Sequence, residues 1–248
     1  MIFWIILPIS LSLVSLIGTW SVYAIAVYNN HVCSLGDWGA AKYCNKNDST
    51  ECCLVPTISS SGTSLPENSL FSAIISGGAF LFLVFSIFHH AHIMEKNAKQ
   101  ALLSRIALVF GIVAATGAFA AGNCNPGNLP LLHHLGAALS FTCICFYTIL
   151  LTSLTGRCLL TGYEKYLYPL RIISSAIQIS VTIGYSILFA QPDYRAIHIS
   201  AVFEWMLSVN LELFELSYVV EFAYFYSWML SNLLIKRDEQ KPLILAMS

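Results

Sequence analysis

Four glutamates lie in the last long apolar segment of this 248-residue chain: Glu204, Glu212, Glu215 and Glu221. A carboxylate at membrane depth is costly and usually serves a function. On a helix, Glu204, Glu212 and Glu215 fall within about 80° of one another, and Glu221 lies off that face. Such a face predicts either the lining of an ion or proton path or, as the sequence favours, protonated carboxyls hydrogen-bonded to neighbouring helices. We expect no basic partner for them inside the membrane, except histidines near Glu204.

Two groups of histidines, at 89–92 and 133–134, have the residue type of metal ligands. They end the second apolar segment and begin the fourth, so they lie at opposite membrane surfaces and cannot share an ion. Apart from Glu95, neither group has a Cys, Asp or Glu nearby to complete a ligand set. We interpret these histidines as amphipathic rings at the headgroup level, and we predict no metal site.

Motifs for catalysis are missing from the sequence. The chain has no Gly-rich phosphate loop, no His-x-x-x-His pair in an apolar segment and no Ser/His/Asp grouping on one side of the membrane. Cytosolic loops of roughly a dozen residues are too short for a catalytic domain. A net charge of -1 gives no indication of nucleic-acid binding. We predict a non-enzymatic protein that needs no cofactor.

The elements that carry these residues are membrane helices. The chain is 57% hydrophobic and 10% charged, whereas ~25% of an average soluble domain is charged. Six segments are long and apolar enough to cross a bilayer, at about 2–27, 69–92, 104–122, 133–155, 171–190 and 197–235. The sequence therefore predicts an all-α, integral membrane six-helix bundle. Small residues recur four apart, as in Gly136-x-x-x-Ser140, and favour close helix packing.

Two of the predicted spans have unusual lengths. The sixth is too long for one crossing, and its aromatic end at 224–228 is typical of an interfacial belt, after which the helix could bend along the surface. The first contains a small-x-small cleavage pattern at 24–26. Its apolar run of about 25 residues exceeds the ~7–15 of a signal peptide, so we expect it to be retained as a span.

Positive charge sets the orientation. With the C-terminus in the cytosol, nine Lys and Arg residues lie on the cytosolic side and three on the other. This bias predicts that both termini are cytosolic. The tail 236–248 and the short loops then present basic residues to anionic lipid or to a docking protein, namely Arg157, Lys165, Lys236 and Arg237.

The first outer loop, 28–68, is the longest connection. It carries four cysteines, Cys33, Cys44, Cys52 and Cys53, and a glycosylation sequon at Asn47. In an oxidising compartment these cysteines allow two disulfides. Because the adjacent Cys52 and Cys53 are poorly placed to pair with each other, each is expected to bridge to Cys33 or Cys44. The remaining cysteines are interpreted as small apolar fillers, although Cys158 beside Arg157 is also placed for palmitoylation.

A resemblance extends over all six segments. Its stretches are Ile5–Ser12, Gly18–Val27, His31-Val32-Cys33, Trp38, Cys52-Cys53, Pro66-Glu67-x-x-Leu70-Phe71, Gly122-Asn123, His133-x-x-Gly136-Ala137, Arg171, Glu204-Trp205 and Glu221-Phe222. In this order they resemble the transmembrane protein 150 family, most closely its A-type group, within the wider DRAM (damage-regulated autophagy modulator) and Frag/Sfk-like family.

The resemblance implies three functions. The A-type group is linked to recruitment of a phosphatidylinositol 4-kinase complex to the plasma membrane, so the first expectation is an adaptor that controls phosphatidylinositol 4-phosphate synthesis. Relatives linked to autophagy suggest a modulator at endosomes or lysosomes. A tail sequence with Glu239, Leu243 and Ile244, which fits an acidic-dileucine signal for sorting adaptors, supports that location. The third expectation is a mechanosensitive-type ion channel or channel subunit.

The outer loop gives the first testable prediction. We expect glycosidase treatment to increase the gel mobility of the protein, because the charge bias places Asn47 outside the cytosol. We also expect the four loop cysteines to resist a thiol label in non-reduced intact cells. Labelling of Cys33 or Cys52 under those conditions would contradict the topology or the pairing.

Overall fold

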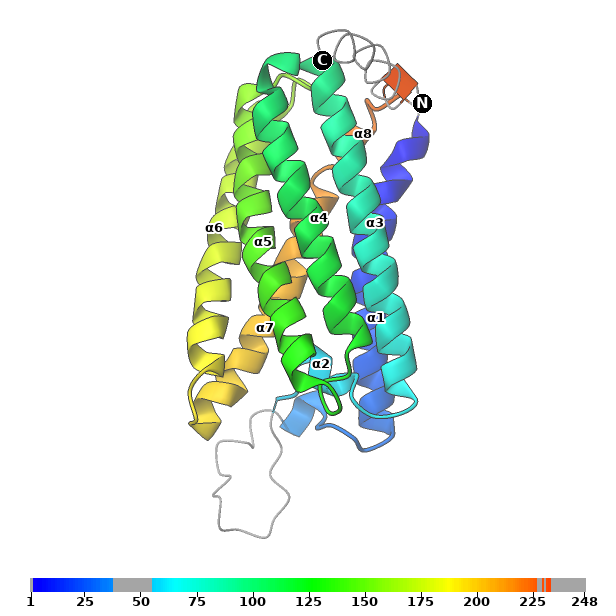
Figure 1. Ribbon diagram of the computed structural model, residues 1–248, viewed down its shortest axis with the longest axis vertical. Coiled ribbons are helices and arrows are strands. Elements are labelled where there is room, and N and C mark those ends of the chain that lie inside the picture. Colours follow the sequence, from blue (N-terminus) through cyan, green and yellow to red (C-terminus); the bar gives the residue numbers. More distant parts are fainter. Residues whose placement is uncertain (1, 38–54, 227–228, 230, 233–248) are drawn as a thin grey trace, which may run out of the picture.

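Six long helices make up most of the structure, a computed structural model that describes residues 2–37, 55–226, 229 and 231–232. In hydrocarbon, a backbone must satisfy its own hydrogen bonds, and a helix does so within one segment. The long helices are α1 (Ile6–Tyr28), α3 (Glu67–Lys96), α4 (Ala101–Asn123), α5 (Pro130–Arg157), α6 (Glu164–Phe189) and α7 (Tyr194–Leu216) (Figure 1). All six are long and apolar enough to cross a membrane, which confirms the expected six-helix class.

Short elements connect or end the long helices. They are η1 (Ile2–Ile5), η2 (Leu35–Asp37), α2 (Ile58–Ser61), η4 (Ala98–Gln100) and α8 (Val219–Phe222). The helical bounds differ from the predicted ones at the fifth and sixth spans. α6 begins at Glu164, two turns before the predicted start at 171, and the last long helix ends at Leu216 instead of continuing to 235. The Ser217 carbonyl and hydroxyl accept hydrogen bonds from Arg171 where α7 ends.

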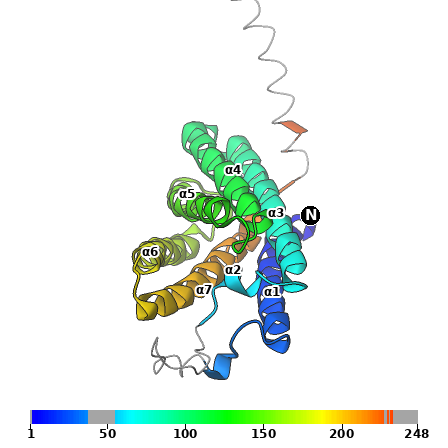
Figure 2. The same ribbon diagram turned by 60° about the horizontal axis from the view of Figure 1, so that its bottom comes forward.

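The long helices form a closed ring. Each contacts the next one in the chain, and α7 returns to pack against α1. Figure 2 shows this ring from its lower end, with α7 crossing behind α2. At one end, here called the terminal end, the ring of Trp4 lies 5.5 Å from that of Phe225, so the beginning and the end of the described chain meet. The opposite end, which carries α2, is called the loop end (Figure 1).

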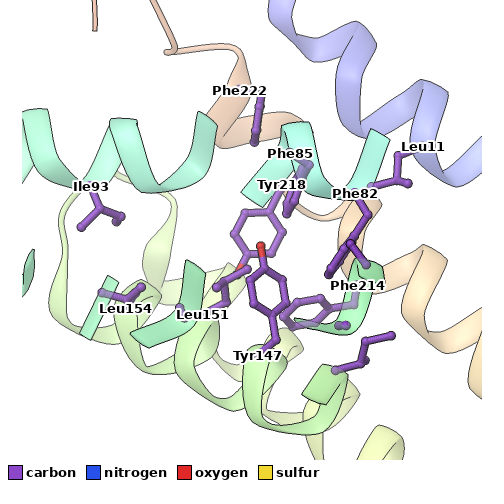
Figure 3. Close-up of a cluster of buried hydrophobic side chains, with 14 of the residues drawn as sticks. Leu11, Phe82, Phe85, Ile93, Tyr147, Leu151, Leu154, Phe214, Tyr218 and Phe222 are labelled. Atoms are coloured by element: carbon purple, nitrogen blue, oxygen red, sulfur yellow. The ribbon is translucent and has the colours of Figure 1, made fainter. Parts of the chain in front are cut away.

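Aromatic side chains fill the ring toward the terminal end. The Phe85 ring stacks on Phe222 at 5.1 Å and meets Tyr218 edge-on at 5.4 Å. The Tyr147 hydroxyl accepts a hydrogen bond from Ser86 at 3.0 Å, and its ring lies 5.1 Å from that of Phe82. Figure 3 shows these rings together with Leu151 and Leu154. The cluster joins five of the long helices, α1, α3, α4, α5 and α7, in one core.

Two glycines determine the closest helix pair. A Cβ added to Gly117 of α4 would lie 2.7 Å from the Gly136 carbonyl oxygen of α5, and one added to Gly136 would lie 2.8 Å from the Gly117 carbonyl. The backbones therefore touch directly, as small residues permit in lipid. The Gly136-x-x-x-Ser140 motif, which predicted close helix packing, therefore lies at the contact between α4 and α5.

This contact gives the second prediction. Gly117→Ala should lower the stability of the purified protein by about 1–3 kcal/mol, because the new methyl group meets backbone atoms that cannot move aside. The control is Gly77→Ala in α3, where a Cβ would meet nothing within 4 Å. The readout is the temperature at which half of the protein remains monodisperse in size-exclusion chromatography. Equal temperatures for the two variants would contradict the close approach.

Candidate functional site

A cavity of about 190 Å³ lies inside the ring, in its loop-end half. Glu204, Glu212 and Glu215 of α7 all line it, so the structure brings together the three carboxylates that were predicted to share a helix face. Polar lining from other helices comprises Ser15, Thr19, Ser59, His133, His134, Ser140, Gln178 and Tyr185. The rest of the lining is mainly aliphatic and aromatic.

Small residues on α3 and α4 explain the space. Their side of the cavity is formed by Gly78, Ala79, Ala114, Ala115, Ala118, Ala121 and Gly122. Such side chains let helices approach but do not fill the centre of a six-membered ring. Toward the terminal end, Phe82, Phe85 and Tyr147 occupy the same central position, and the cavity ends there.

The carboxylates themselves are only partly paired. Glu212 accepts a hydrogen bond from Ser208 of its own helix at 2.9 Å, and Glu204 accepts one from the Ser59 backbone N–H at 3.4 Å. Among the described residues, the second oxygen of each has no hydrogen-bond partner. In the part of the chain that the structure describes, the expected bonds from these carboxyls to Ser, Thr or Asn of neighbouring long helices are not formed. Asn210 links α7 to α6 instead, by donating to the Gln178 side chain at 2.7 Å.

The segment around α2 covers the cavity at the loop end. The Trp205 indole donates to the Pro56 carbonyl at 2.9 Å, and the Val55 N–H donates to His198 at 3.1 Å. His198 is therefore bound to the backbone of this segment. At the edge, Glu67 accepts from Asn29 at 2.7 Å. The first two bonds attach the cover to α7, and the third joins the end of α1 to the start of α3 beside it.

On the terminal-end side of the cavity lies a buried ion-pair layer that the sequence did not predict. Arg171 of α6 is fully buried and donates to Glu221 of α8 at 2.5 Å and to Thr155 of α5 at 2.6 Å. Its remaining donors reach Ser217, and its guanidinium carbon lies 3.4 Å above the Tyr218 ring. His89 of α3 lies 3.2 Å from the other Glu221 oxygen.

The expectation that Glu221 lacks a basic partner was wrong. Arg171 had been assigned to the cytosolic surface as the first residue of its span, but the helix starts at Glu164 and carries Arg171 two turns inward. The signal was available in the preceding apolar stretch, Tyr166 to Leu170, which can extend the span. A carboxylate and a guanidinium at the same depth satisfy each other, so neither remains an isolated charge.

Most of the histidines interpreted as outward-reaching rings are instead buried within the bundle. His89, His92 and His133 are at most 3% exposed. His133 bonds to the Ala121 carbonyl at 2.8 Å and so closes the α4–α5 connection. His134 is exposed, as predicted. In the described part of the chain, no group of three or more His, Cys, Asp or Glu residues is arranged to hold a metal ion.

The surface at the terminal end is basic. Arg157 and Lys165, two of the predicted cytosolic contacts, are exposed on either side of the α5–α6 turn. The Glu164 carboxylate orders this turn by accepting backbone hydrogen bonds from Leu160, Thr161 and Gly162. Cys158, in the same turn, is 2% exposed, and burial raises the pKa of its thiol to about 11, which favours a structural role over modification.

Several predicted positions lie outside the described residues. They are Asn47, Cys44, Cys52, Cys53, Lys236, Arg237, Glu239, Leu243 and Ile244. Of the loop cysteines, Cys33 lies within the described part, where its carbonyl accepts a hydrogen bond from Tyr23 at 2.9 Å. Glycosylation, disulfide pairing and sorting therefore stay predictions.

The fold and its interior define a six-helix integral membrane protein with a polar core. The sequence model of the Frag1/DRAM/Sfk1/Cwh43P N-terminal domain matches residues 3–225. The chain therefore belongs to the Frag1/DRAM/Sfk1 family, as the resemblance predicted.

Similarity to individual members of this family extends over most of the chain. Transmembrane protein 150A of Xenopus laevis is 30% identical over 229 residues, which cover 89% of this chain and 84% of that protein. Modulator of macroautophagy TMEM150B-A of Xenopus laevis is 28% identical over 88% of this chain and 86% of its own length. DNA damage-regulated autophagy modulator protein 1 of Homo sapiens is 23% identical over 68% of this chain and 77% of its own length. No solved structure matches.

The ion-pair layer gives the third prediction. Arg171→Met should destabilise the protein by about 3–5 kcal/mol, because it leaves the Glu221 carboxylate buried without its guanidinium. The double replacement Arg171→Met with Glu221→Met should be less destabilising than the sum of the single changes. Arg105→Met, at an exposed position of α4, is the control and should have little effect. Additive single effects in a chemical unfolding series would show that the pair is not coupled.

Proposed function

We propose that this protein is a non-enzymatic membrane adaptor whose terminal-end face recruits a phosphatidylinositol 4-kinase complex to the plasma membrane and so promotes phosphatidylinositol 4-phosphate synthesis. The observation that carries the proposal is the basic, ordered surface at that end. Its exposed residues come from three neighbouring regions of the ring: Lys96, Lys99, Arg105, Arg157 and Lys165. The resemblance to the A-type group, which is linked to kinase recruitment, favours this function, and transmembrane protein 150A is among the similar relatives.

The charge distribution supports a cytosolic terminal end. Among the described residues, the loop end carries a single Lys or Arg, which is Arg195. Basic residues near membrane helices favour the cytosolic side. There they also attract the anionic lipids of the inner leaflet, which are the substrates and products of a lipid kinase. A basic face beside the bilayer suits an adaptor that holds such a kinase at its substrate.

The packed interior favours an adaptor over a channel. The acidic cavity ends at the aromatic and ion-pair layers, where Phe85, Tyr147 and Arg171 are at most 2% exposed. Conduction needs a continuous path with sites that an ion can enter and leave. The described residues at the terminal end leave no such path through the ring.

Modulation of autophagy at endosomes or lysosomes is the second candidate function. Its support is the relatives whose names identify them as modulators of macroautophagy or of autophagy after DNA damage. The predicted tail signal would direct the chain to those membranes. The two functions predict different readouts, lipid level for the first and autophagic flux for the second, so one charge-reversal experiment with both measurements distinguishes them.

That experiment is the fourth prediction. In cells lacking the endogenous protein, Arg157→Glu with Lys165→Glu should reduce kinase recruitment and plasma-membrane phosphatidylinositol 4-phosphate at least about fivefold, because each basic residue near an anionic surface contributes ~1 kcal/mol. Arg195→Glu at the loop end is the matched control and should behave like the wild type. A lipid biosensor and co-precipitation of kinase subunits measure the effect. Altered autophagic flux with unchanged lipid would favour the second function and contradict the first.

A further inference from the structure

We propose that the cavity in the loop-end half of the ring is a binding site for a small organic amine in its protonated form, with an apolar body of about the size of a benzene ring. Neither the adaptor function nor the relatives' names assign a ligand to this cavity. The site is separate from the basic terminal-end face, since the ion-pair layer lies between them.

The charge of the lining selects a cation. Three carboxyl groups line the cavity, and no Lys or Arg is among its described lining residues. Glu204 and Glu212 are 7% and 5% exposed, and one oxygen of each has no hydrogen-bond partner among the described residues. A buried acceptor without a donor is unfavourable, and a charged donor forms the strongest hydrogen bond with it. An ammonium group supplies that donor.

The size of the cavity limits the body of the ligand. An engineered cavity of ~150 Å³ lined by apolar residues holds a benzene molecule. This cavity, at about 190 Å³, therefore accommodates one ring with a short aminoalkyl arm. A two-chain lipid is too large for it. The apolar wall formed by Ala115, Ala118 and Ile144 suits a hydrocarbon ring rather than a polar body.

The positions of the carboxylates indicate how the ligand lies. Glu212 and Glu215 are three residues apart on the same face, so one ammonium group can reach both. Glu204 is eight residues, or about 12 Å, from Glu212 along the helix and lies near the α2 cover. We place the ammonium group at Glu212 and Glu215 and the ring toward Ala118. His134, which is exposed, and Tyr185, which is half-buried, are the lining residues through which the cavity approaches the surface.

A metal cation fits less well. The three carboxylates do not converge, and no set of three ligand-type residues in the described chain surrounds a common point. A divalent ion with oxygen ligands needs at least six of them at short range. An elongated organic cation needs one or two carboxylates and an apolar wall, which is what the cavity provides.

The test uses the full-length protein in nanodiscs, with 2-phenylethylamine as the probe and 2-phenylethanol as its uncharged counterpart. Isothermal titration should show saturable binding of the amine, weaker binding of the alcohol and none to empty nanodiscs. Glu212→Gln should weaken amine binding about tenfold or more, since it removes a charge-assisted bond, and should leave alcohol binding unchanged. Ala118→Phe should abolish binding of both compounds by filling the cavity.

Matched controls keep the result decisive. Glu95→Gln removes a carboxylate at the terminal end and should bind the amine like the wild type. Chromatographic behaviour and helix content identify any variant that fails to fold, and Glu212→Gln, which is nearly isosteric, retains the acceptor for Ser208. No saturable amine binding to the wild type, equal affinity for amine and alcohol, or an unchanged affinity in Glu212→Gln would each overturn the proposal.

Discussion

The structure depends most on one requirement, that the guanidinium of Arg171 must be satisfied within the membrane-spanning part of the bundle. Its donors are distributed over Thr155 of α5, Ser217 after α7 and Glu221 of α8, and its planar face lies on Tyr218. A fixed fork of donors suits this arrangement better than a lysine ammonium would. Ser217 offers both its hydroxyl and its carbonyl to Arg171 at the point where α7 ends, and α8 then places Glu221 beside the guanidinium.

The same requirement divides the interior of the ring into two halves. Around Arg171, large aromatic side chains complete a buried environment in which a hydrogen-bonded ion pair is held in one geometry. Toward the loop end, glycine and alanine on α3 and α4 bring the backbones close but leave the centre open, and the carboxylates of α7 face that space. The terminal-end half is therefore tightly packed, and the loop-end half contains the cavity. Both follow from the size of the side chains that the neighbouring helices present to α7.

Features that repeat along the chain could be predicted from the sequence, and features that depend on pairing could not. Apolar run length identifies six helices, and the helical period correctly places Glu204, Glu212 and Glu215 on one face. The depth of Arg171, however, depends on where α6 begins, and apolar run length defines helix ends poorly. The burial of His89 depends on Glu221, which lies 132 positions later in the chain. Contacts between residues so far apart in the chain depend on how the helices pack, which apolar run length does not indicate.

The order of synthesis adds a consequence to the Arg171–Glu221 pair. The two residues are 50 positions apart, and a chain grows at ~5–20 residues per second, so the arginine emerges roughly 3–10 s before its counterion. Thr155, made 16 positions earlier, is the first of its bonding partners to be available. During this interval α6 carries an uncompensated charge, which favours a position near the membrane surface over full insertion. Because an unpaired charge is costly at membrane depth, the bond to Glu221 stabilises α6 in the position that the closed ring gives it.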